Sequence, residues 1–185
     1  MKNTSLQYDN IIKEARELFI KKMQDYGTSW RVLRLPSLTD QIFIKAKRIR
    51  SIQQSGENLV GDSQWGEFIA IVNYGVIALI QCNLKDDERE EIPFNETESL
   101  YDRFIKQTKT LMMKKNHDYG EAWRDMRISS MTDLILQKIL RLKQIEDNQG
   151  RTLVSEGVEG SYADIINYAV FCLIRMDEEK NNIAE

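Results

Sequence analysis

The sequence predicts an all-α fold in which tandem duplicated three-helix units pack as a pseudo-two-fold helical bundle. Three observations lead to this prediction. The 185 residues include only two prolines and nine glycines, so long stretches contain no helix breaker. Apolar residues recur at helical spacing within those stretches. One ordered set of residues occurs twice along the chain, which indicates a tandem duplication.

A shift of 93 positions places the first half of the chain on the second. It carries Asp25-Tyr26-Gly27 onto Asp118-Tyr119-Gly120. The further matches at this shift are Tyr8 with Tyr101, Trp30-Arg31 with Trp123-Arg124, Arg34 with Arg127, Thr39-Asp40 with Thr132-Asp133, Lys45 with Lys138, and Arg48 with Arg141. After a one-residue insertion the shift becomes 94 and places Asn73-Tyr74 on Asn167-Tyr168. Matching in this order predicts that both halves fold alike.

An acidic segment separates the two copies. We expect residues 1–86 to form the first helical repeat and residues 94–185 the second, with 87–93 as an acidic linker that ends in a helix-stopping proline. Two repeats are too few for a solenoid. We therefore expect both to form one compact domain, packed as the subunits of a homodimer are.

The first helix of each unit is expected over about residues 6–25 and 98–117, where apolar side chains recur every three or four positions. Gly27 and Gly120 follow these helices directly. Glycine adopts positive φ without a steric penalty, so each is placed to end its helix.

The second helices are expected to begin at Ser37 and Ser130. Each serine is followed three residues later by an aspartate, which is the pattern of a capping box. The third helices are expected over about residues 62–82 and 162–176. Their nearly continuous apolar sequence predicts that they lie at the centre of the bundle.

Composition and charge limit the kinds of ligand and location that the protein is expected to have. The net charge of −3 and pI near 5.4 argue against duplex nucleic acid as the main ligand, because duplex binding usually requires a basic excess. A small phosphorylated ligand in a local basic pocket stays compatible with this charge. No segment is expected to span a membrane. Cys82 and Cys172 lie in apolar runs without metal-ligand spacing, which favours buried free thiols in a reducing cytoplasm.

Basic and aromatic residues of the second half suggest a phosphate site. Trp123, Arg124 and Arg127 follow the glycine break; arginine offers forked donors suited to phosphate, and a tryptophan face can stack on a base. Lys138 and Arg141 are spaced i, i+3 and share one helix face. The alternative is that the tryptophan belongs to the core and the basic side chains are solvated.

The third helix of the second half contains a carboxylate in an apolar run. Asp164 and Asn167 interrupt that run, and an unpaired buried carboxylate would cost several kcal/mol. Asp164 therefore needs a cation. Either an arginine, Arg141 or Arg124, or a divalent metal would serve.

A magnesium site is the metal alternative. Glu156 or Asp133 could complete an oxygen-ligand site with Asp164, since Mg²⁺ prefers carboxylate oxygens. The first half has Ala70 in place of Asp164, so we expect the second half to hold the fuller site.

The motif of the second half resembles a known family. It consists of Asp118-Tyr119-Gly120, Trp123-Arg124, Arg127, Ser130, Thr132-Asp133, Lys138, Arg141, Glu156-Gly157 and Asp164-Ile165-Ile166-Asn167-Tyr168. In order and spacing it resembles nucleotide modification associated domain 1, a family of bacterial and phage proteins, here in tandem copy. The resemblance covers nearly the whole chain. It implies a role in nucleotide or modified-base metabolism.

A more distant similarity is to the all-alpha, MazG-like nucleoside triphosphate pyrophosphohydrolases, which hold magnesium with helix carboxylates. Their hallmark is a Glu-x-x-Glu helix followed by a Glu-x-x-Asp helix. This sequence departs from it, with Lys138 and Arg141 where paired glutamates would stand and Ser161 in place of a further glutamate.

The leading hypothesis is a cytoplasmic protein that binds a small-molecule nucleotide, with Mg²⁺-dependent pyrophosphohydrolysis as the candidate reaction. Asp164 and Glu156 are the predicted catalytic residues, with Asp133 as a further metal ligand. The predicted substrate-binding residues are Tyr119, Trp123, Arg124, Arg127, Lys138, Arg141 and Asn167. The alternative is a non-enzymatic nucleotide-sensing or scaffold protein whose polar motif is an internal ion-pair network. A homodimer is compatible with either. The leading hypothesis requires the repeated polar side chains to converge on one pocket.

Overall fold

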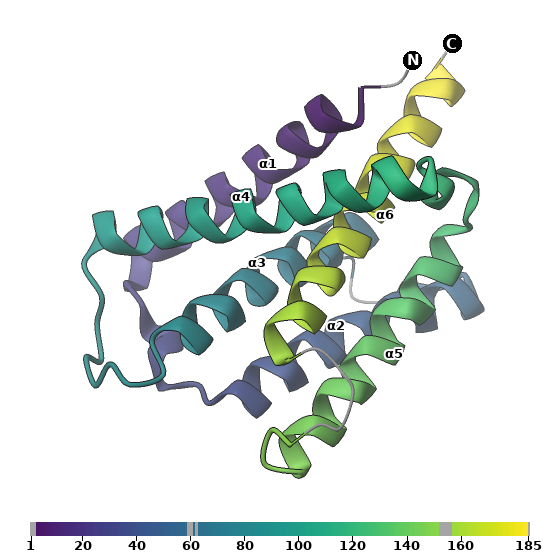
Figure 1. The fold of residues 1–185 in the computed structure, drawn as a ribbon. Helices are drawn as coiled ribbons and strands as arrows, with labels where there is room; N and C mark the ends of the chain where they lie inside the picture. The colour runs from purple at the N-terminus through teal and green to yellow at the C-terminus, as the bar shows by residue number, and fades with distance from the viewer. Residues whose placement is uncertain (1–2, 59–60, 62, 152–156, 185) are drawn as a thin grey trace.

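The computed structural model describes residues 3–58, 61, 63–151 and 157–184, and this part of the chain is helical without a strand. The all-α prediction is confirmed. The first unit contains α1 (Thr4–Tyr26), the short 3₁₀-helix η1 (Ser29–Val32), α2 (Leu35–Ser55) and α3 (Gln64–Asn83). The second contains α4 (Phe94–Tyr119), η2 (Ala122–Asp125), α5 (Ile128–Asp147) and α6 (Val158–Ala184) (Figure 1).

Glycine ends the first helix of each unit, as predicted. Gly27 and Gly120 are the C-cap residues of α1 and α4, with φ of 59° and 60°. Their backbone N–H groups donate to Met23 and Asn116, four residues earlier. The chain then reverses through η1 or η2, which begin two residues after each glycine.

The capping-box prediction is wrong. α2 and α5 begin before Ser37 and Ser130, with Arg34 and Arg127 as N-cap residues that make no side-chain cap hydrogen bond. In α2, a proline in the first turn favours this earlier start, because its fixed φ suits a helix N-terminus. The aspartates of the two Ser-x-x-Asp sequences are free for contacts with the other unit.

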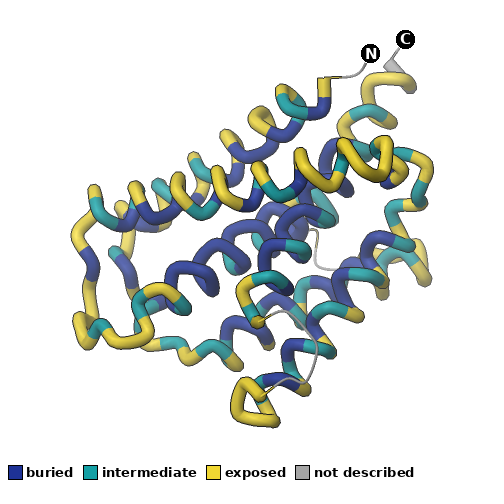
Figure 2. The backbone as a smooth tube through the Cα atoms, in the orientation of Figure 1, coloured by how far each residue is buried: buried dark blue, intermediate teal, exposed yellow. Residues whose placement is uncertain are grey.

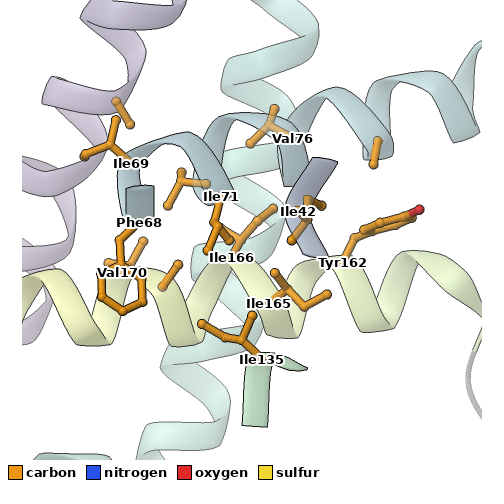
Figure 3. Packing of buried hydrophobic residues seen from close by; sticks show 14 of the residues in the cluster. Ile42, Phe68, Ile69, Ile71, Val76, Ile135, Tyr162, Ile165, Ile166 and Val170 are labelled. Carbon is orange, nitrogen blue, oxygen red and sulfur yellow. The ribbon is translucent and has the colours of Figure 1, made fainter. Parts of the chain in front are cut away.

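The helices pair in three layers. α3 and α6 pair in the middle, α2 and α5 on one side, and α1 and α4 on the other (Figure 1). Figure 2 shows α3 and α6 buried over most of their length. Apolar side chains of these two helices, among them Ile71 and Ile166, gather between them (Figure 3). The prediction that the third helices are central is confirmed.

The two central helices lie close together at Gly75 in α3. A Cβ atom at this position would lie 2.6 Å from Ile166 Cγ1 of α6. Such a contact is shorter than side-chain carbons adopt, so glycine is required for this helix spacing.

α3 is also the only helix among the described residues that is long and apolar enough to cross a membrane, which departs from the expectation that no segment would be. Of its most apolar window, 72% is buried inside the protein. The core helix of a soluble protein has the same properties, and the central position of α3 accounts for its composition.

Reciprocal contacts between the units show the pseudo-two-fold arrangement. Arg16 of α1 pairs with Asp102 of α4 at 2.6 Å, and Lys109 of α4 pairs with Asp9 of α1 at 2.7 Å. Positions 16 and 109 are equivalent in the repeat, as are 9 and 102. Between α2 and α5 the same exchange joins Arg50 with Asp133 and Lys143 with Asp40.

Buried polar contacts follow the same exchange. The Tyr8 hydroxyl donates to Asn167 Oδ1 at 3.0 Å, and the Tyr101 hydroxyl donates to Asn73 Oδ1 at 2.8 Å. Burial raises the pKa of both phenols, so both stay protonated donors. Each unit thus completes the hydrogen bonds of the other, as in a homodimer interface.

One half-buried acid, Glu146, breaks the equivalence between α2 and α5. Glu146 Oε1 accepts hydrogen bonds from the Thr39 hydroxyl at 2.5 Å and the Tyr162 hydroxyl at 3.3 Å. Burial raises the pKa of Glu146, although both hydrogen bonds oppose the shift. The equivalent residue Gln53 is a neutral amide that donates to Thr132 at 3.1 Å. The same contact is therefore made by a carboxyl group in the second unit and by an amide in the first.

Candidate functional site

A pocket of about 350 Å³ opens between α4, η2, α5 and α6 in the second unit. Its walls carry four aromatic rings, Tyr119, Trp123, Tyr168 and Phe171. They also carry three charged side chains, Lys115, Lys138 and Asp164. Ring faces and ammonium groups in one concave site can hold a flat ligand that bears negative charge.

The aromatic wall is built where the chain reverses after Gly120. Trp123 of η2 stacks on Phe171 of α6, with ring centroids 4.1 Å apart and planes inclined by 3°. Tyr168 meets Phe171 edge to face at 6.3 Å. Trp123 Nε1 is the only side-chain nitrogen or oxygen that is buried without a hydrogen-bond partner in the described part of the chain. A buried donor without an acceptor lowers the stability of the fold by roughly 1–3 kcal/mol, so this unpaired N–H distinguishes the aromatic wall from the rest of the core.

Two lysines hold the carboxylate of Asp164. Lys115 Nζ donates to Oδ1 and Lys138 Nζ donates to Oδ2, both at 2.6 Å. The Asp164 side chain is 13% exposed. Burial alone would raise its pKa, but the lysine hydrogen bonds outweigh burial and hold the pKa below the ordinary carboxyl value. The group as a whole carries one net positive charge.

The predicted need of Asp164 for a cation is confirmed, but the prediction of an arginine partner is wrong. Lys115, which reaches Asp164 from α4, was not among the predicted site residues. One signal could have identified it: Lys22 and Lys115 are a matched pair in the repeat, in the same way as Lys45 and Lys138.

Five of the predicted site residues line this pocket, namely Tyr119, Trp123, Lys138, Asp164 and Asn167. Asn167 lines it from a core position. Its Oδ1 accepts from Tyr8, and its amide nitrogen donates to the Thr108 carbonyl at 3.4 Å. These bonds give Asn167 a structural role between α1, α4 and α6.

The three predicted arginines lie outside the pocket lining, so the expected convergence does not extend to them. Arg124 donates to Glu121 at 2.7 Å, to Glu178 at 2.8 Å, and to side chains of the first turn of α1. It therefore ties η2 to α6 and α1. Arg127 is exposed at the N-terminus of α5, and Arg141 is half-buried on α5.

Two of the predicted magnesium ligands, Asp133 and Asp164, lie among the described residues, and basic side chains face both carboxylates. Asp133 is 58% exposed and faces Arg50 at 3.5 Å, while both oxygens of Asp164 are engaged by lysines. Glu156 lies outside the described residues. Residues 3–58, 61, 63–151 and 157–184 contain no group of three His, Cys, Asp or Glu side chains placed to hold a metal ion. A carboxylate held by two ammonium groups does not fit Mg²⁺, which requires several free oxygen ligands.

The acid of the central helix occupies different turns in the two units. In the first unit, Glu67 receives Lys45 at 3.2 Å and Arg48 at 2.5 Å. Glu67 is equivalent to Ser161, and Ala70 is equivalent to Asp164, so the carboxylate is displaced by one helical turn. Lys45 of α2 therefore pairs with Glu67, whereas its counterpart Lys138 of α5 lines the second-unit pocket.

A family model described as nucleotide modification associated domain 1 matches the chain twice, over residues 22–82 and 115–176. The two segments cover more than half of the chain and each runs from the end of the first helix of a unit into its third helix. No curated protein and no solved structure matches the chain. Similarity to the MazG-like pyrophosphohydrolases is not found among these matches.

Proposed function

Because this chain belongs to the nucleotide modification associated domain 1 family, we propose that its second-unit pocket binds a nucleotide. The observation that carries the proposal is the pocket itself, in which aromatic rings and two lysines face one cavity of about 350 Å³. Small-molecule sites usually measure about 300–1,000 Å³. The base would stack on the aromatic wall, and the phosphate would meet the ammonium groups.

Stacking and charge supply the affinity in this proposal. One base stacked on an aromatic side chain gains roughly 1–3 kcal/mol. Lysine binds phosphate as a point charge, and Lys115 and Lys138 converge from two helices. Tyr119 is exposed at the rim, where its ring can cover a base that enters the pocket.

The phosphate competes with Asp164 for the lysines. In the free protein, Asp164 neutralises one of the two positive charges and keeps both ammonium groups in place. A bound phosphate takes over these ammonium groups. The carboxylate is then able to accept hydrogen bonds from N–H groups of the base.

Hydrolysis of a nucleoside triphosphate by water, which yields the monophosphate and pyrophosphate, is the candidate reaction, and it is proposed separately from binding. The described residues contribute to it by orienting the phosphates against Lys115 and Lys138. Binding without turnover would leave the first part of the proposal intact.

The test is calorimetric titration of the full chain with nucleoside mono-, di- and triphosphates, with and without Mg²⁺, followed by product analysis. Lys115→Gln with Lys138→Gln should weaken nucleotide binding by more than about tenfold, because each charge-assisted hydrogen bond contributes about 1.5–3 kcal/mol. The matched control is Lys22→Gln with Lys45→Gln in the first unit, which should retain nucleotide affinity. No heat with any nucleotide, or equal losses in both double variants, would refute binding in this pocket.

One observation favours the second candidate function, a nucleotide-sensing or scaffold protein with a structural ion-pair network. The Lys115–Asp164–Lys138 group is already satisfied without a ligand. Asp164→Asn separates the two functions. If the pocket binds nucleotides, affinity for phosphate should rise, since the lysines lose their internal competitor. If the protein is instead a scaffold whose network is structural only, nucleotides should bind to neither the wild type nor the variant.

A further inference from the structure

The first unit contains a second pocket, built from the equivalent elements. It measures about 320 Å³ and lies between α1, η1 and α3. Trp30, Tyr26 and Tyr74 take the places that Trp123, Tyr119 and Tyr168 take in the second unit. The duplication has therefore preserved three aromatic positions in the walls of this cavity.

The charges of this pocket differ from those of its counterpart. Ala70 replaces the aspartate, and Lys45 is held by Glu67 and does not line the cavity. Among the described residues of the lining, Lys22 is the only charged one. Within the part of the chain that the structure describes, Lys22 makes neither a hydrogen bond nor an ion pair, whereas its counterpart Lys115 holds Asp164.

The lining of this pocket includes exposed apolar side chains. Val32 is 83% exposed and Tyr26 is 55% exposed, although both are apolar or aromatic. Large apolar side chains that are exposed beside a concave site are typical of ligand-binding surfaces. A ligand here would cover apolar surface and meet one cation.

We infer that the first-unit pocket is a second ligand site, and that it binds a planar aromatic compound with a single negative charge. One free ammonium group balances one negative charge, so a polyphosphate would be poorly matched. Without a carboxylate, the cavity offers no charged acceptor for the N–H groups of a polar ring. The apolar rings Trp30 and Tyr74 instead suit an apolar ring face. This inference is independent of nucleotide binding in the second unit.

The experiment uses two probes with the same ring, indole-3-acetate as the anion and indole-3-ethanol as its neutral analogue. Both are titrated into the full chain by calorimetry. The anion should bind about three- to fivefold more tightly than the neutral compound, because an ion pair with the exposed Lys22 adds roughly 0.6–1 kcal/mol.

Three variants test the position of the site. Lys22→Gln should abolish the preference for the anion and leave binding of the neutral ring unchanged. Ala70→Phe fills the cavity and should abolish binding of both compounds. Lys115→Gln, the matched change in the second-unit pocket, should leave the binding of both compounds unchanged. Lys22 is exposed, so its variant is expected to fold, and circular dichroism checks each variant.

Two outcomes would overturn the inference. One is no binding of either probe to the wild-type chain. The other is a loss that follows Lys115→Gln and not Lys22→Gln, which would place the compound in the second-unit pocket. Nucleotide titration of the same variants distinguishes either outcome from a failure of the proposed function.

Discussion

Replacing Asp164 by asparagine removes the charge that two lysines share. Asparagine has almost the same shape, and its carbonyl oxygen can still accept one hydrogen bond, so the change tests charge with little change in packing. Lys138 is 19% exposed and would remain as a half-buried cation without a carboxylate. We expect Asp164→Asn to destabilise the protein.

The magnitude follows from the two partners. Lys138 donates at 2.6 Å from a half-buried position, and a hydrogen bond to a charged group contributes about 1.5–3 kcal/mol. Lys115 is 45% exposed, so solvent screens its pairing to at most about 1 kcal/mol. Since asparagine retains part of these bonds, the expected loss is about 2 kcal/mol. For a protein of this size, that corresponds to a fall in Tm of about 4–8 °C.

The assay is urea unfolding at neutral pH, followed by circular dichroism, in a double-mutant cycle with Lys138→Met. Removing the unpaired cation should restore part of the stability that Asp164→Asn loses, because an apolar side chain replaces a half-buried charge. Glu67→Gln is the matched change in the first unit. Its carboxylate is also buried and receives two cations, so a loss of similar size is expected.

The pH dependence supplies a second measurement. The pKa of Asp164 is lowered in the folded protein, so its contribution is fully present above the ordinary carboxyl pKa of about 4 and is lost as pH falls through the lowered value. The difference in stability between wild type and Asp164→Asn should therefore shrink below about pH 4. A loss smaller than about 0.5 kcal/mol at neutral pH, with no coupling to Lys138, would refute the assignment of this ion-pair group.

Three further changes test the packing of the units. Tyr101→Phe leaves the buried amide oxygen of Asn73 without its donor and should cost about 1–2 kcal/mol in chemical denaturation; an unchanged midpoint would contradict the cross-unit hydrogen bond. Gly75→Ala places a Cβ 2.6 Å from Ile166 Cγ1 and should lower the free energy of unfolding by about 1–3 kcal/mol. Shortening Ile166 to valine should restore part of this stability. Full stability of the single variant would show that the helices separate freely. Glu146→Gln removes an acid whose pKa is raised by burial, so its ionisation above the ordinary carboxyl pKa opposes folding. Relative to wild type, the variant should therefore gain stability as pH rises from 4 to 7, by less than about 1 kcal/mol. A loss of stability at pH 7 would contradict this sign.

The helical design of each unit could be predicted from the sequence, because helix periodicity and glycine termination are local properties. Gly27 and Gly120 end their helices as expected, and the apolar third helices are central. The duplication was visible for the same reason: residues in matching order need no knowledge of contacts. Both α2 and α5 begin before their Ser-x-x-Asp sequences, at equivalent positions and with or without a proline in the first turn, so that local pattern did not determine the helix start.

The interaction partners of the long basic side chains could not be predicted from the sequence. Arg124 was expected at a phosphate site, yet it joins Glu178 of α6 and the first turn of α1. Arginine and lysine side chains are long and flexible, so their partners depend on which acids of other helices come within reach. Sequence spacing along one helix says nothing about those distances.

By itself, the sequence determined a duplicated helical protein with a carboxylate on its last helix that had to be neutralised, since burial of a lone charge is too unfavourable to persist. Which cation neutralises Asp164 was decided only by tertiary structure. The arrangement of α4 and α5 beside α6 brings Lys115 and Lys138 to the two oxygens. The displacement of the acid by one turn in the first unit leaves Lys22 without an ion pair among the described residues. The physical reason is that charge pairing acts through space, between helices whose relative positions are set by packing of the shared core.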